Sequence, residues 1–191
     1  MAVTPSSRLE LGTPAPDFTL PDTDGRTVSP ADFGSAPALL VMFLCNHCPF
    51  VKYVQRQLAL LCRQFQARGA AVVAISSNDS ERYPDDGPER MKEVRRQAGY
   101  SFPYLYDESQ SVAKAHRAAC TPEFYLFDRR RRLAYHGQFD GSRPTNGQPV
   151  TGADLAAAVD ALLGGKPVSS DQKPSVGCSI KWKPGNEPDY A

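Results

Sequence analysis

The sequence lacks the charge excess of a protein that binds nucleic acid or an anionic membrane surface. Its 22 Lys and Arg residues are nearly balanced by 21 Asp and Glu residues, so the formal net charge is only +1. This balance gives no electrostatic reason to expect either partner. The four arginines at 129–132 are a local exception, and their position between two apolar segments favours a solvated hairpin turn.

Long apolar segments are also missing. No segment approaches the roughly 20 apolar residues that a membrane-spanning helix needs. Residues 1–8 lack the basic start and apolar core that are typical of a signal peptide. We therefore expect the protein to stay in the cytosol, away from membranes.

Five cysteines, at positions 45, 48, 62, 120 and 178, stand in a chain of 191 residues. This length suits one domain with a substantial core. Because the cytosol keeps thiols reduced, we expect redox chemistry or metal binding rather than a framework of structural disulfides.

Two of the cysteines lie between a predicted strand and a predicted helix. Residues 39–44 form an apolar run that is typical of a buried strand, and Pro49 suits the first position of a helix. Cys48 would then stand at a helix N-terminus, where free N–H groups and the helix dipole stabilise a thiolate. The pattern predicts that Cys48 is a nucleophile near neutral pH.

The rest of the chain predicts alternating strands and helices. Apolar residues recur at steps of three and four behind Pro49, which gives a helix with a buried face that includes Cys62. The expected elements are a hairpin turning at Asp24-Gly25, a helical turn at 29–34, helices at 49–69, 89–98, 109–118 and 153–163, strands at 70–76, 102–106, 123–128 and 133–139, and a surface loop at 78–88.

The last residues form a tail of different composition. Residues 166–191 are rich in Pro, Lys and Gly and show no periodicity, so we divide the chain into a domain at 1–165 and an extension at 166–191. The extension carries Cys178 and the only tryptophan, Trp182. We expect it to pack on the domain, because a dispensable linker would rarely hold both.

The order of elements, with Cys-x-x-Cys after the first core strand, resembles the thioredoxin fold. Residues 15–18 (Ala-Pro-Asp-Phe) are similar to the opening of the AhpC/TSA peroxiredoxin-like branch, and Thr121-Pro122 resembles the cis-proline loop of thioredoxins. Segments 45–51, 120–124 and 177–183 resemble uncharacterised bacterial peroxiredoxin-like proteins. The resemblance implies an α/β thioredoxin-like fold, with a central mixed sheet flanked by helices, an N-terminal β-hairpin and a C-terminal extension.

The resemblance also implies roles for the site residues. Cys48, followed by Pro49, matches the first active-site cysteine of thioredoxins and the peroxidatic cysteine of peroxiredoxins. Cys45 falls where peroxiredoxins keep a threonine. Thr121 and Pro122 would form the substrate-binding loop, because in such folds the backbone of the residue before the proline binds extended substrate. His47 and Pro49, on either side of Cys48, are the other expected substrate-binding residues. No cofactor is implied.

Two departures from the peroxiredoxin signature favour disulfide chemistry. The proline and threonine of the signature are replaced by Val41 and Cys45, and Thr121 stands where peroxiredoxins carry an arginine, which leaves Arg143 or Lys52 as substitutes. We expect Cys48 to attack a protein or small-molecule disulfide and Cys45 to resolve the mixed disulfide, since exchange needs a second thiol nearby. The alternative is a thiol peroxidase that reduces hydrogen peroxide or organic hydroperoxides.

Three further residues keep two interpretations each. His47 is either an imidazole that raises the thiolate fraction of Cys48 or a solvent-facing residue that fills the turn. Cys120 lies near Cys48 if the cis-proline loop packs there, or is a buried bystander. Cys178 either folds back as a resolving thiol or anchors the tail. For the two remaining histidines, His116 and His136, no partner is apparent.

A different class of function is a non-enzymatic zinc or redox-sensing module. Cys45, Cys48, Cys120 and Cys178 would satisfy tetrahedral zinc if they converged, although a second paired Cys-x-x-Cys is absent. For the favoured enzyme, the expected partners are a disulfide or peroxide substrate and a cellular thiol reductant such as a thioredoxin, with the oligomeric state left open.

Overall fold

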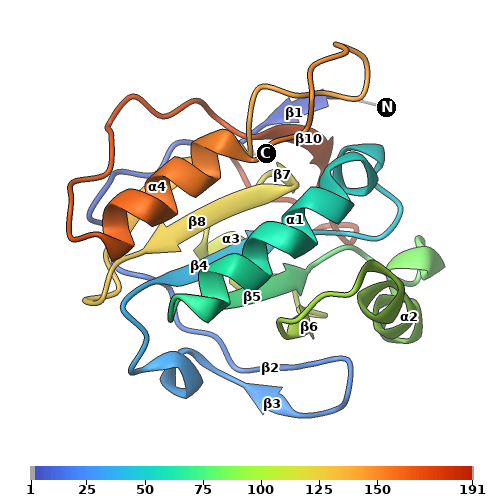
Figure 1. Ribbon diagram of the computed structural model, residues 1–191. Coiled ribbons are helices and arrows are strands. Elements are labelled where there is room, and N and C mark those ends of the chain that lie inside the picture. Colours follow the sequence, from blue (N-terminus) through green and yellow to red (C-terminus); the bar gives the residue numbers. More distant parts are fainter. Residues whose placement is uncertain (1–2, 191) are drawn as a thin grey trace.

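A five-stranded mixed sheet forms the centre of the computed structural model, which describes residues 3–190 (Figure 1). The strand order is β6-β5-β4-β8-β9. β4 is parallel to β5 and antiparallel to β8, so the predicted α/β class with a central mixed sheet is confirmed. The strands are β4 (Leu39–Phe43), β5 (Ala71–Ser76), β6 (Tyr104–Tyr106), β8 (Glu123–Phe127) and β9 (Leu133–Gly137).

Helices cover both faces of this sheet. In Figure 1, α1 (Pro49–Ala67) and α4 (Ala153–Leu163) lie across one face, and α3 (Ser111–Ala115) lies behind the other. α2 (Pro88–Ala98) contacts β6 at the sheet edge. Two short 3-10 helices are η1 (Pro30–Phe33) and η2 (Pro84–Asp86). No helix of residues 3–190 combines the length and apolar character that crossing a membrane requires.

The apolar residues of β4 divide between two cores, which explains their unbroken run. Leu40 and Met42 face the core under α1, whereas Leu39, Val41 and Phe43 face the core under α3. All five residues of β4 are therefore buried. Cys62, on the buried face of α1, is fully buried, as predicted.

The predicted N-terminal hairpin is confirmed as a short pair of strands. β2 (Leu20–Pro21) and β3 (Thr27–Val28) are antiparallel, and Gly25 adopts a positive φ of 80° in the turn. A glycine tolerates this conformation without a Cβ clash.

A second small sheet consists of three strands that the sequence did not predict. β10 (Val176–Ser179) lies between β1 (Val3–Pro5) and β7 (Cys120–Thr121), and both pairings are antiparallel. Trp182 packs partly buried against the core under α3. Residues 1, 2 and 191 of the predicted domain and extension lie outside the described residues.

Two predicted segments differ in the structure. The helix expected at 109–118 is only five residues long, because Gln110 and Arg117, on either side of it, have positive φ angles. The prediction that residues 78–88 form a surface loop is wrong for Asn78, Asp79 and Asp86, because these residues are buried.

Candidate active site

Cys48 caps the N-terminus of α1. Its φ and ψ of −66° and 122° are extended, and Pro49 follows at the first helical position, where a missing N–H costs no hydrogen bond. The chain reaches this point from the buried strand β4 through the turn at residues 44–47. Cys48 is itself fully buried.

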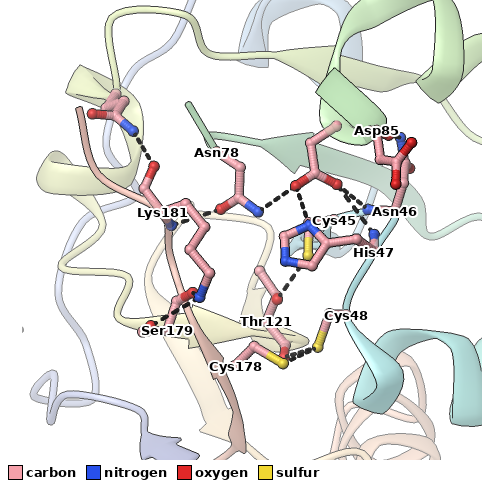
Figure 2. A network of polar contacts seen from close by, with 12 residues as sticks. Cys45, Asn46, His47, Cys48, Asn78, Asp85, Thr121, Cys178, Ser179 and Lys181 are labelled. Atoms are coloured by element: carbon pink, nitrogen blue, oxygen red, sulfur yellow. Dashed lines mark hydrogen bonds and ion pairs between the residues drawn. The ribbon is translucent and has the colours of Figure 1, made fainter. Parts of the chain in front are cut away.

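Several donors converge on the sulfur of Cys48 (Figure 2). The Cys45 thiol, the Cys178 thiol and the backbone N–H of Val51 stabilise its thiolate, and against the cost of burial they lower its pKa to about 5. The Cys48 Sγ lies 2.8 Å from the Cys178 Sγ and 3.2 Å from the carbonyl oxygen of Thr121. At neutral pH Cys48 is therefore a thiolate within a group of thiols.

The other two thiols of the group stay protonated. The hydrogen bond to the Cys48 thiolate, together with burial, holds the pKa of Cys45 well above its usual range. Burial and the Cys48 thiolate raise the pKa of Cys178 to about 12. The site thus holds one nucleophile and two thiols that donate hydrogen bonds to it.

Thr121 contacts two of these cysteines from the loop before β8. Its Oγ1 lies 3.2 Å from the Cys45 Sγ, and its carbonyl oxygen accepts the S–H of Cys48 when that thiol is protonated. The Thr121-Pro122 peptide bond is cis. The structure therefore brings together Cys45, Cys48, Thr121 and Cys178, which are scattered over the sequence.

The ring of His47 points to a carboxylate and not to Cys48. Its Nδ1 lies 2.5 Å from the Oδ2 of Asp86, and the ring stacks on Tyr83. Neither interpretation of His47 from the sequence included this partner, which is a buried aspartate from the 78–88 segment.

Asp86 fixes the turn that carries the cysteines. Its Oδ1 accepts the backbone N–H groups of Asn46 and His47, and its Oδ2 also accepts the side-chain N–H of Asn78. Asp86 is fully buried and all of its acceptors are used. No pattern in the sequence indicates this role, since Asp86 lies in a polar, proline-rich segment.

The residues that could together bind a metal ion differ from the four cysteines considered in the sequence analysis. Within residues 3–190, Cys45, His47 and Asp86 are the group whose donor atoms lie within 4.8 Å of one another. Within the described residues, the four cysteines of the zinc alternative do not form such a group. In the Cys45 group, the carboxylate of Asp86 is already occupied by four N–H donors.

Cys120 belongs to a neighbouring buried network. Its backbone N–H donates to the Oε2 of Glu123, and burial together with that carboxylate holds its pKa well above the usual range. The Oε1 of Glu123 accepts the hydroxyl of Tyr125 and contacts the Nε2 of His136 at 2.8 Å. His136 thus has a partner that the sequence did not reveal.

Arg143 and Lys52, the possible substitutes for the peroxiredoxin arginine, are not directed at the Cys48 sulfur by any described contact. Arg143 lines a small cavity with Phe50, Pro122 and Val176, but its guanidinium donates to the carbonyls of Asp140 and Ser142 and to the side chain of Gln138. Lys52 lines a separate cavity beside α2.

Comparison with known proteins finds relatives in sequence and in fold. The model of the AhpC/TSA family matches residues 11–136. A Mycobacterium tuberculosis protein named "Putative peroxiredoxin" is 30% identical over 123 residues, which make up 64% of this chain and 73% of that protein.

Solved structures extend the similarity. An uncharacterized conserved protein from Geobacillus kaustophilus has 55% sequence identity and a TM-score of 0.95, over 97% of this chain and 98% of that one. The thioredoxin domain of a thiol-disulfide oxidoreductase from Bacteroides vulgatus has 20% identity and a TM-score of 0.57, over 68% and 89% of the two chains. At this identity the second match shows the fold alone, and it confirms the thioredoxin-like fold.

Proposed function

Since the chain belongs to the AhpC/TSA family and is a peroxiredoxin-like oxidoreductase, we propose that it is a thiol-disulfide oxidoreductase whose attacking group is the Cys48 thiolate. The observation that carries this proposal is the position of Cys48 at the N-terminus of α1, with its sulfur 2.8 Å from that of Cys178, where the surrounding thiols and a helix N–H group lower its pKa to about 5. A thiolate is the form of cysteine that attacks a disulfide.

The surroundings of Cys48 supply the second half of the reaction. Attack on a disulfide gives a mixed disulfide between Cys48 and one half of the substrate, and a second thiol must release it. Cys45 and Cys178 both donate hydrogen bonds to the Cys48 thiolate, so both are close enough to act. Cys45 is the resolving thiol expected from the sequence, and Cys178 is the one argued for below.

The internal disulfide formed in this way needs an external reductant. We propose a cellular thiol such as a thioredoxin for this step, and the cytosol, which keeps thiols reduced, as the location.

Reduction of peroxides is the second candidate function. The similarity to the M. tuberculosis protein favours it, and so does the small cavity of Phe50, Pro122 and Arg143 beside the first turn of α1. Against it, the oxygen of Thr121 contacts Cys45, and the guanidinium of Arg143 is directed to Gln138 and two carbonyls. The guanidinium of Arg143 is therefore not free to polarise a peroxide at Cys48.

Stopped-flow kinetics separates the two functions. The fully reduced protein is mixed with bis(2-hydroxyethyl) disulfide or with hydrogen peroxide, and each rate constant is divided by that of free cysteine at the same pH. We expect a large enhancement for the disulfide and little for the peroxide. The opposite ratio would replace this proposal by the peroxidase, and no enhancement for either oxidant would reject both.

A further inference from the structure

The strand β10 closes the active site by pairing with β7. Cys178 pairs with Thr121 and Ser179 with Cys120, both antiparallel, and the N–H of Ile180 donates to the carbonyl of Ala119 at 3.1 Å. Figure 2 shows Cys178 and Thr121 on one side of the Cys48 sulfur. A strand from the end of the chain therefore lies directly over the reactive thiol.

The position of β10 is one that an extended peptide could occupy. β7 lies at the end of the order β1-β10-β7, so β10 is its only sheet neighbour in the described chain. A strand edge with free backbone groups binds extended peptides by adding a strand. With β10 in place, the backbone edge beside Cys48 is already paired, and Cys48 and Cys178 are both buried.

We propose that β10 is a built-in substrate strand: it presents Cys178 to Cys48 and excludes protein disulfides, so that the enzyme reacts with small oxidants and stores the result as a Cys48–Cys178 disulfide. This proposal rests on the proposed function and names its substrate class and its resolving thiol.

The chemistry balances with these two cysteines. The Cys48 thiolate attacks a small disulfide RSSR, the S–S bond breaks, and RS⁻ leaves with Cys48–S–SR formed. The Cys178 thiol gives its proton to the leaving RS⁻, and its sulfur attacks Cys48, which releases a second RS⁻ that takes a proton from water. Two electrons pass from the two cysteines to RSSR, and an external thiol later restores both.

The same two sulfurs also serve if the oxidant is a hydroperoxide. The Cys48 thiolate would then attack ROOH, the O–O bond would break, and RO⁻ would leave and take a proton from water, which leaves Cys48 as a sulfenic acid. The Cys178 thiol would displace the oxygen of the sulfenic acid as water, with formation of the Cys48–Cys178 disulfide. Because Cys48 and Cys178 are buried, a polypeptide is excluded whether the small oxidant is a disulfide or a hydroperoxide. The cavity lined by Phe50, Pro122 and Val176 comes from the same chain segments as Cys48, Thr121 and Cys178, and we assign the approach of a small molecule to it.

The tail beyond β10 is held by specific contacts. The backbone N–H of Lys181 donates to the Oδ1 of Asn78, and its carbonyl accepts from the N–H of Asp79 and from the side chain of Gln110. Asn78 also donates to Asp86, which fixes the cysteine turn. β10 is thus tied to the same segment that supports the nucleophile.

Gly177 allows the close approach of β10 to β7. A Cβ placed on Gly177 would lie 2.0 Å from the carbonyl oxygen of Thr121 and 2.7 Å from its carbonyl carbon. Because Cβ atoms in proteins do not approach backbone atoms so closely, Gly177→Ala must move β10 away from β7. Gly34→Ala is a matched control, because Gly34 has an ordinary φ of −54° at an exposed turn away from the cysteines.

The test compares a small oxidant with a protein disulfide. Reduced full-length protein is mixed with bis(2-hydroxyethyl) disulfide, hydrogen peroxide or insulin, and each rate is divided by the rate of dithiothreitol with the same oxidant. We expect the normalised rate with insulin to be lower than that with the small disulfide by about tenfold or more, because insulin docks only when β10 is detached. Gly177→Ala should narrow this gap, and Gly34→Ala should leave it unchanged.

Peptide mapping of the wild-type protein after one equivalent of oxidant gives a second readout that needs no variant. We expect a Cys48–Cys178 disulfide as the main product. A Cys45–Cys48 product, or equal normalised rates with insulin and the small disulfide, would overturn the built-in strand while leaving the proposed function intact. If no oxidant reacts faster than with free thiol, the proposed function falls together with this inference.

Discussion

The sulfur atoms of Cys178 and Cys48 lie 2.8 Å apart, although the two residues are separated by 130 positions in the sequence. The contact joins the last strand of the chain to the N-terminus of α1. It means that the Cys-x-x-Cys turn is only part of the redox centre. The following experiments test how the surrounding groups set the reactivity and stability of that centre.

The ionisation of Cys48 should be visible in acid. Because its pKa is lowered to about 5, the thiolate should be present at neutral pH and should disappear as the pH falls through about 5. Ultraviolet thiolate absorbance of the reduced protein measures this. Cys48→Ser should remove the transition, whereas Cys62→Ala should keep it, since burial raises the pKa of the Cys62 thiol. A transition that survives in Cys48→Ser would assign it to another thiol.

Cys45 should tune Cys48 through its S–H donor. The hydrogen bond from Cys45 is the largest cause of the low pKa of Cys48. A hydrogen bond to a charged group contributes about 1.5–3 kcal/mol, so Cys45→Ala should raise the pKa of Cys48 by about 1–2 units. Cys45→Ser keeps a donor and should raise it less. Equal titration curves for the two variants would argue that the donor is unimportant.

Replacing Asp86 should destabilise the cysteine turn. In Asp86→Asn, one of the two carboxylate oxygens becomes an NH₂ group. That group faces the backbone N–H groups of Asn46 and His47 if it replaces Oδ1, and the side-chain donors of His47 and Asn78 if it replaces Oδ2. We expect the free energy of unfolding to fall by about 1–3 kcal/mol, measured by denaturant titration. Asp85→Asn is the matched control, because the Asp85 side chain is exposed and only its carbonyl contacts Asn46. Equal effects of the two changes would contradict the anchoring role.

Glu123 should matter for stability and not for the reactive thiolate. Its carboxylate is fully buried and accepts the N–H groups of Ala119 and Cys120 as well as the Tyr125 hydroxyl. Glu123→Gln should lower the free energy of unfolding by about 1–3 kcal/mol and leave the acid transition of Cys48 in place. Glu108→Gln, at an exposed position, should be neutral. A large shift of the Cys48 titration in Glu123→Gln would instead show that the Glu123 network and the thiols around Cys48 are coupled.

The elements with local signals were predictable from the sequence. The apolar run at 39–43, Pro49 at the start of α1 and the glycine of the Asp24-Gly25 turn each specify a conformation through neighbouring residues. The same local signal placed Cys48 at a helix N-terminus.

The parts that depend on distant partners were not predictable. β10 shows no alternation of apolar and polar residues, because its pairing comes from β1 and β7 at distant points of the chain. Asp86 has the sequence context of a surface loop, and its role depends on the distant N–H groups of Asn46 and His47 that donate to it. His47 was interpreted through its sequence neighbour Cys48, although its partner lies 39 residues away.

The central claim is that Cys48 is the attacking thiolate, and one measurement tests it most directly. The second-order rate constant with bis(2-hydroxyethyl) disulfide is determined for the reduced wild-type protein, for Cys48→Ser and for Cys45→Ser. We predict that Cys48→Ser loses the enhancement over free cysteine and that Cys45→Ser keeps a measurable part of it. Full reactivity in Cys48→Ser, with loss in Cys45→Ser, would contradict the account and make Cys45 the nucleophile.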